Sequence, residues 1–71
     1  MFTTSDIALA AYLMMQGLKL KSASREHSGR FRFEFEDPDG TGPEHAVNYV
    51  NSEAAKFDAH VKNLKNILFK N

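Results

Sequence analysis

The feature that constrains this chain most is the segment RFRFEFE at residues 30–36, where phenylalanine alternates strictly with charged residues. Phe31, Phe33 and Phe35 occupy every second position. A period of two is that of a β-strand, because successive side chains of a strand point to opposite faces of its sheet. The segment therefore predicts a strand with one face of three benzyl groups and one charged face.

These three benzyl groups could belong to the core or form an exposed platform for nucleic-acid bases. Base-stacking strands of RNA-recognition motifs interleave glycine with their aromatic residues, whereas Arg32 and Glu34 stand in the gaps here. Burial of each phenylalanine contributes about 1.5–3 kcal/mol, against a total stability on the order of 5 kcal/mol for so small a domain. We therefore expect all three rings to lie inward, beneath helices.

Length, cysteine content and charge limit the classes of protein. The chain has 71 residues and no cysteine, which predicts one small domain (1–71) without disulfides or thiolate zinc sites and fits a cytoplasmic setting. Its net charge of zero gives no global attraction to nucleic acid or membrane. Residues 18–32 nevertheless carry five basic residues and one acidic residue (+4), and residues 34–44 carry five acidic residues and no basic one (−5).

A helix is predicted over about residues 5–16. Thr3 and Asp6 have the spacing of a capping box, and Gly17 suits the C′ position. The apolar run at residues 7–15 is about half the length of a membrane span and follows an acidic residue, so we expect neither a span nor a signal peptide.

A β-hairpin follows, with its turn at residues 26–29. In the predicted register the numbers of opposed residues sum to 55, which keeps apolar residues on one face and opposite charges on the other. The opposed pairs are then Leu20 with Phe35, Ser22 with Phe33, Lys19 with Glu36, and Lys21 with Glu34.

Two further helices are predicted after a turn-rich loop at residues 37–43. Thr41 and Glu44 have capping-box spacing before a helix over about 43–50, and a last helix over about 53–70 carries an apolar stripe. One continuous helix over 43–70 is the open alternative. The stripe consists of Phe57, Val61, Leu64 and Leu68. The predicted fold class is α+β, in the order α-β-β-α-α, a β-hairpin with helices packed on one face.

Several short segments also suggest a family. They are residues 2–4 (FTT), residues 11–13 (AYL), Gly17, the aromatic strand at residues 31–37, and Leu64-Lys65. Through them the chain resembles a family of small domains of unknown function found in phages and bacteria. The resemblance covers nearly the whole chain and brings no catalytic residues. It implies a phage or prophage context, in the cytoplasm of a bacterial host cell.

The outer face of the hairpin is a candidate nucleic-acid surface. With the phenylalanines inward, the basic side chains project the other way and could contact phosphates. The candidate residues are Lys19, Lys21, Arg30 and Arg32, with Arg25 on the same face. The alternative is a solvated face partly neutralised by glutamates, since charged outer strands also protect sheets from aggregation.

No residue pattern indicates catalysis or a metal. Asp37 and Asp39 begin like a calcium loop, but the twelfth position is Asn48 rather than a bidentate glutamate. The three histidines lack metal-ligand spacing, and no cysteine nucleophile exists. We expect no enzyme, cofactor or metal. An enzyme would need a metal or substrate in a pocket lined by Asp37, Asp39 and His45.

The first helix is apolar on nearly every side. We expect a face with Ile7, Ala11 and Met14 to cover the sheet, leaving the opposite face for the last helix or for a partner. That opposite face consists of Leu9, Tyr12, Leu13 and Met15. The free edges of the hairpin offer a second route to association. We expect a non-enzymatic protein-interaction module that self-associates, with a dimer favoured, and accessory nucleic-acid binding as the alternative; no membrane partner is expected.

Overall fold

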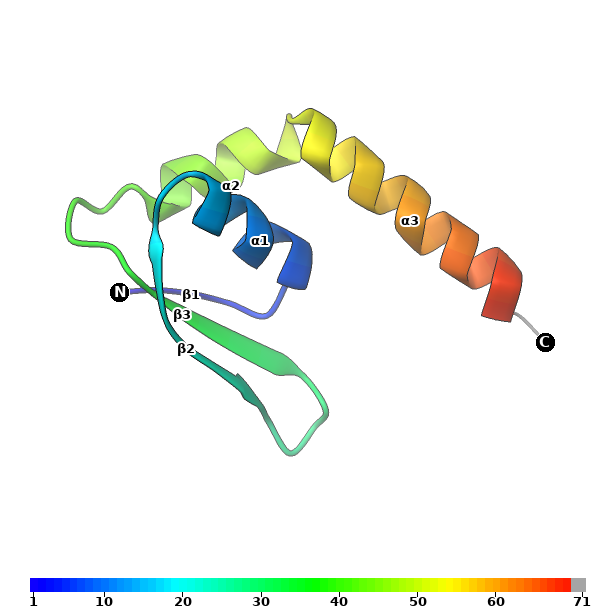
Figure 1. The fold of residues 1–71 in the computed structure, drawn as a ribbon, viewed down its shortest axis with the longest axis horizontal. Helices are drawn as coiled ribbons and strands as arrows, with labels where there is room; N and C mark the ends of the chain where they lie inside the picture. Colours follow the sequence, from blue (N-terminus) through cyan, green and yellow to red (C-terminus); the bar gives the residue numbers. More distant parts are fainter. Residues whose placement is uncertain (70–71) are drawn as a thin grey trace.

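The computed structural model describes residues 1–69 and has the α+β class that the sequence predicts. Three antiparallel strands form one sheet in the order β1-β3-β2, and three helices accompany it (Figure 1). The elements are β1 (Phe2–Thr4), α1 (Ile7–Met15), β2 (Lys19–Arg25), β3 (Phe31–Glu36), α2 (Gly42–Val50) and α3 (Glu53–Phe69).

The first strand, β1, was not predicted. It pairs with β3, setting Phe2 opposite Phe35 and Thr4 opposite Phe33. The capping box at Thr3 is therefore wrong, because Thr3 belongs to the strand. Asp6 is the N-cap of α1 instead: its Oδ1 accepts hydrogen bonds from the backbone N–H groups of Ala8 and Leu9, at 2.9 and 3.2 Å.

The hairpin of β2 and β3 follows the predicted register only at its base. Lys19 lies opposite Glu36 and Leu20 lies opposite Phe35, as predicted. The register then shifts between Leu20 and Ser22, which leaves Lys21 as an extra residue of a bulge. The predicted Ser22–Phe33 and Lys21–Glu34 pairs are wrong for this reason; Ser22 lies opposite Glu34, and Ala23 lies opposite Phe33.

The turn of the hairpin lies where the sequence predicts it. The N–H of Glu26 donates to the carbonyl of Arg30 at 2.8 Å, and Gly29 takes a left-handed conformation with φ of 85°. A loop of this kind, with glycine in the left-handed region, matches the twist of the two strands.

The core lies between α1 and the base of the sheet. Ala10, Leu13 and Phe35 are buried, and a ring of partly buried apolar side chains packs around them. The predicted orientation of α1 is wrong, because Ile7 and Met14 are 63% and 54% exposed, whereas Leu13 is fully buried. Since α1 is apolar on nearly every side, its periodicity did not distinguish the inner face from the outer one. The surrounding side chains are Phe2, Leu9, Leu18, Leu20 and Phe33.

The three strand phenylalanines are buried to different degrees. Phe35 has no exposed surface, Phe33 is partly buried, and Phe31 is 42% exposed. The prediction that all three lie in the core is thus confirmed for Phe35 and wrong for Phe31. A nine-residue helix is only about 13 Å long, so α1 covers the base of the sheet and leaves the hairpin tip open.

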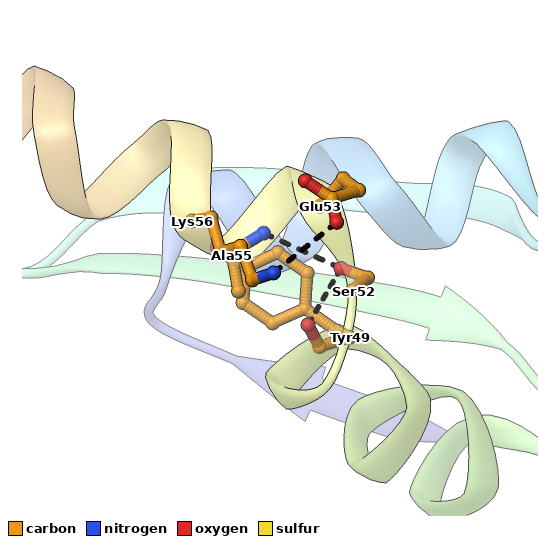
Figure 2. Close-up of polar contacts among 5 residues, drawn as sticks. All are labelled: Tyr49, Ser52, Glu53, Ala55 and Lys56. Carbon is orange, nitrogen blue, oxygen red and sulfur yellow. Dashed lines mark hydrogen bonds and ion pairs between the residues drawn. The ribbon is translucent and has the colours of Figure 1, made fainter.

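The last two helices are separate. Asn51 ends α2, and Ser52 caps α3 by accepting a hydrogen bond from the N–H of Ala55 at 3.3 Å (Figure 2). The Ser52 hydroxyl also donates to the carbonyl of Tyr49 at 2.6 Å, which fixes the bend between the helices. From there α3 extends away from the rest of the molecule (Figure 1).

Candidate interaction surface

An apolar groove runs between α1 and the first half of α3. Its volume is about 360 Å³. Small and large apolar side chains line the groove, and Asp58 is the one charged residue among them. The lining residues are Ala8, Ala11, Tyr12 and Met15 of α1, Tyr49 of α2, and Ala54, Phe57, Asp58 and Val61 of α3. This composition suits an apolar side chain of a partner.

Two tyrosines join α1 to α2 at this groove. The ring of Tyr12 lies against that of Tyr49, with centroids 5.4 Å apart and the planes at 57°. Such tilted pairs are favourable aromatic contacts. Burial raises the pKa of the Tyr49 phenol, and the nearby Asp58 carboxylate raises it further. The two rings therefore form an aromatic wall of the groove.

An ion pair lies at the edge of the groove. Lys62 Nζ is 2.9 Å from Asp58 Oδ2, one helical turn away on α3. The hydrogen bond to Asp58 and the charge of that carboxylate raise the pKa of Lys62. The Asp58 side chain is only 22% exposed, so one face of α3 has a fixed negative group beside apolar residues.

The apolar stripe of α3 is mostly uncovered. We define the α3 stripe as Ala54, Phe57, Val61, Leu64 and Leu68. Phe57, Leu64 and Leu68 are 72%, 58% and 74% exposed. Every described residue from position 62 onward is exposed, and no described residue of α3 is buried. The body of the protein therefore covers the stripe only at its first turns.

The four interface candidates of the first helix are not equivalent. Leu13 is fully buried in the core, and Leu9 packs against that core, so neither is open to a partner. Tyr12 is partly buried in the groove, and Met15 is 78% exposed at its rim. The structure brings Tyr12 and Met15 to one surface. The site residues missed from the sequence are those of the α3 stripe, although their four-three-four spacing was visible.

The candidate nucleic-acid residues are all exposed but do not form a purely basic face. Lys19 lies opposite Glu36, and Arg32 Nη2 is 3.3 Å from Glu34 Oε2 on the same strand. The Ser22 hydroxyl donates to Glu34 at 2.6 Å, and this hydrogen bond, with that from Arg32, lowers the pKa of Glu34.

The remaining basic residues are spread over other parts of the hairpin. Lys21 lies in the bulge, and Arg30 lies in the hairpin turn, directly before the first residue of β3. Arg25 was expected on the charged face. It lies on the phenylalanine face instead, with its guanidinium 5.8 Å from the centre of the Phe31 ring.

Asp37, Asp39 and His45 do line one hollow, of about 330 Å³. The Asp37 carboxylate accepts hydrogen bonds from the backbone N–H groups of Thr41 and Gly42, at 2.8 and 2.9 Å. These bonds, that from Gly42 foremost, lower the pKa of Asp37. Asp37 thereby caps α2, in place of the predicted capping box at Thr41, whose hydroxyl makes no cap bond. Within residues 1–69 no three metal-ligating side chains cluster.

None of the helices in the described part of the chain combines the length and apolar character that a bilayer crossing requires.

Comparison with known proteins identifies a family. The family model described as a domain of unknown function, DUF5659, matches residues 1–70, so the chain belongs to this family. The resemblance seen in the sequence is confirmed at this level. No curated protein and no solved structure matches the chain.

Proposed function

We propose that this member of the DUF5659 family is a non-enzymatic protein-interaction module that self-associates through α3 and the groove beside it. A dimer is the favoured form, in the cytoplasm of a bacterial cell and in a phage or prophage context. The observation that carries the proposal is the exposure of Phe57, Leu64 and Leu68 on one side of a 17-residue helix.

The α3 stripe is hard to explain in an isolated monomer. Most of the stability of a helix in a protein comes from packing its apolar face against other elements. Here residues 62–69 are all exposed. Covering one large apolar side chain contributes up to about 1.5–3 kcal/mol, so a partner on this face would stabilise both the helix and the assembly.

Exposed apolar surface continues from α3 onto α1. Met15 lies at the rim of the groove and is 78% exposed, and Phe57 faces the same groove. Contiguous apolar surface of this kind is typical of interaction sites rather than of scattered surface residues. Methionine and aromatic side chains are also enriched in interfaces between proteins.

Sedimentation at two protein concentrations tests self-association. We expect a larger species at the higher concentration, and Leu64→Asp to remove it because a carboxylate cannot be buried there unpaired. Val47→Asp is the matched control, since Val47 is 63% exposed on α2 and does not line the groove. A single monomeric species of the native chain at both concentrations would contradict the proposal.

Nucleic-acid binding is the second candidate function. It is supported by the exposure of the four basic candidates on the hairpin, Lys19, Lys21, Arg30 and Arg32. It is weakened by Glu34 and Glu36, which lie on the charged face of the same strand. A salt-dependent mobility shift with mixed oligonucleotides tests it. Binding that survives replacement of both Arg30 and Arg32 by Glu would rule this surface out.

A further inference from the structure

The spacing of the α3 stripe is that of a coiled-coil seam. Its members follow one another at intervals of three, four, three and four residues, which is the a and d pattern of a heptad. Ala54, Val61 and Leu68 are then a positions, and Phe57 and Leu64 are d positions. A seam of this kind is suited to packing along a second helix.

The two ends of the stripe differ in a complementary way. At its first turns the stripe borders the groove, formed with Ala8, Ala11 and Met15 of α1. At its last turns, Leu64 and Leu68 project from a part of α3 where every described residue is exposed. One end is therefore a receptor for apolar side chains, and the other end supplies them.

We propose that α3 pairs antiparallel with α3 of a second copy of this chain, each copy placing Leu64 and Leu68 in the groove of the other. This inference rests on the proposed self-association and specifies its geometry. In an antiparallel pair related by a two-fold axis, a positions of one helix meet d positions of the other. Leu68 of one copy then faces Phe57 of the other, and Val61 faces Leu64. The same surface serves both copies, as a closed dimer requires.

Charges beside the seam select the antiparallel orientation. Asp58 and Lys65 occupy the e flank, and Glu53 and His60 occupy the g flank. Antiparallel symmetry brings like flanks together, so Asp58 of each copy lies near Lys65 of the other. A parallel pair would instead bring e next to g, setting Asp58 against Glu53 and Lys65 against His60. Flanking charges of this kind set the orientation of paired helices.

Charge reversal distinguishes the two orientations. In the antiparallel dimer Lys65→Glu replaces two attractive pairs by two repulsive ones, and we expect the dimer dissociation constant to rise at least about tenfold, or about 1.4 kcal/mol. In a parallel dimer the same change would leave the affinity equal or higher. Lys56→Glu is the matched control, because it makes the same charge change on the outer side of α3, where Lys56 contacts only Glu53 among the ion pairs of the described residues.

A mixture of two charge variants should associate more strongly than either variant alone. In the antiparallel arrangement, two Lys65→Glu chains bring carboxylates together at the e flank, and two Asp58→Lys chains bring ammonium groups together there. A mixed pair has two attractive contacts instead. We expect sedimentation to show dimers in the mixture and fewer in either variant alone. Circular dichroism checks that Asp58→Lys, which loses its contact with Lys62, remains folded.

A distance measurement tests the geometry without altering the charges of the e flank. Because the chain has no cysteine, Glu53→Cys carries a single spin label. The two labels would lie at opposite ends of an antiparallel pair, about 28 Å apart along the axis, and side by side in a parallel pair. A dimer with adjacent labels, or one unaffected by Lys65→Glu, overturns the inference and leaves the proposed function standing. A native chain that stays monomeric overturns both.

Discussion

Shortening Leu68 to alanine should weaken the dimer strongly and leave the folded monomer nearly unchanged. The substitution removes three carbon atoms, and each buried methylene contributes about 0.8 kcal/mol. Leu68 is 74% exposed in the single chain, so most of this contribution arises only when a partner covers it. Scaled by that exposed fraction, the loss of association free energy is about 1.8 kcal/mol for each copy and about 3.5 kcal/mol for a symmetric dimer. That corresponds to an increase in the dissociation constant of about 300-fold.

The assay is sedimentation equilibrium of the native and Leu68→Ala chains, with urea unfolding of the dilute monomer in parallel. Alanine has the highest helix propensity, so α3 itself should not be weakened. Val47→Ala is the control, because it removes a similarly exposed aliphatic side chain away from the groove. A dissociation constant within threefold of the native value would refute the reasoning, because Leu68 would then remain exposed in the dimer.

Three further predictions concern the fold and its caps. Leu13→Ala should lower the free energy of unfolding by about 2–5 kcal/mol, since Leu13 is fully buried; Met14→Ala, at a 54% exposed neighbouring position, should cost far less, and equal losses in urea unfolding would contradict the assigned orientation of α1. Asp37→Asn should reduce the loss of stability on acidification. The folded-state pKa of Asp37 lies below its ordinary value of 3.8, so its contribution is present above that pH and is lost as the pH falls through the folded pKa; thermal melts across this window that are parallel for both chains would argue against the cap. Ser52→Ala should cost about 0.5–2 kcal/mol through loss of the α3 cap, and unchanged hydrogen exchange at the start of α3 would count against it.

Local rules predicted the parts of the fold that depend on neighbouring residues. Gly17 has the left-handed conformation expected after a helix, with φ of 95°, and Gly29 closes the hairpin turn. The break at Asn51 and Ser52 separates α2 from α3, as a capping serine indicates. Each of these features is decided within a few residues, by glycine conformation or by a side chain that caps a backbone group.

Features that depend on distant partners were not predictable in this way. The strand β1 has three residues, too few to show a period, and it exists because Phe2 and Thr4 pair with β3 about thirty positions later. The bulge at Lys21 changes every pair beyond it, yet the sequence of β2 does not mark it. Phe31 remains exposed because α1 is too short to cover the hairpin tip. The alternation of residues in a strand does not show how far a helix extends over it.

The sequence showed the spacing of the α3 stripe but not that the stripe is exposed. The spacing of Phe57, Val61, Leu64 and Leu68 predicted one apolar face of a helix, as the structure has it. The sequence could not show that the body of the protein ends near Val61, which leaves the later leucines uncovered. That depends on where α1 and α2 lie relative to α3, and hence on the whole chain.

Hydrogen exchange of the second half of α3, at low and at high protein concentration, tests whether a second copy covers the α3 stripe. If a second copy covers this segment, backbone amides of residues 62–69 should exchange more slowly as the concentration rises, while those of the buried base of β3 stay constant. Exchange at residues 62–69 that is fast and independent of concentration would show that no second copy of the chain covers the α3 stripe.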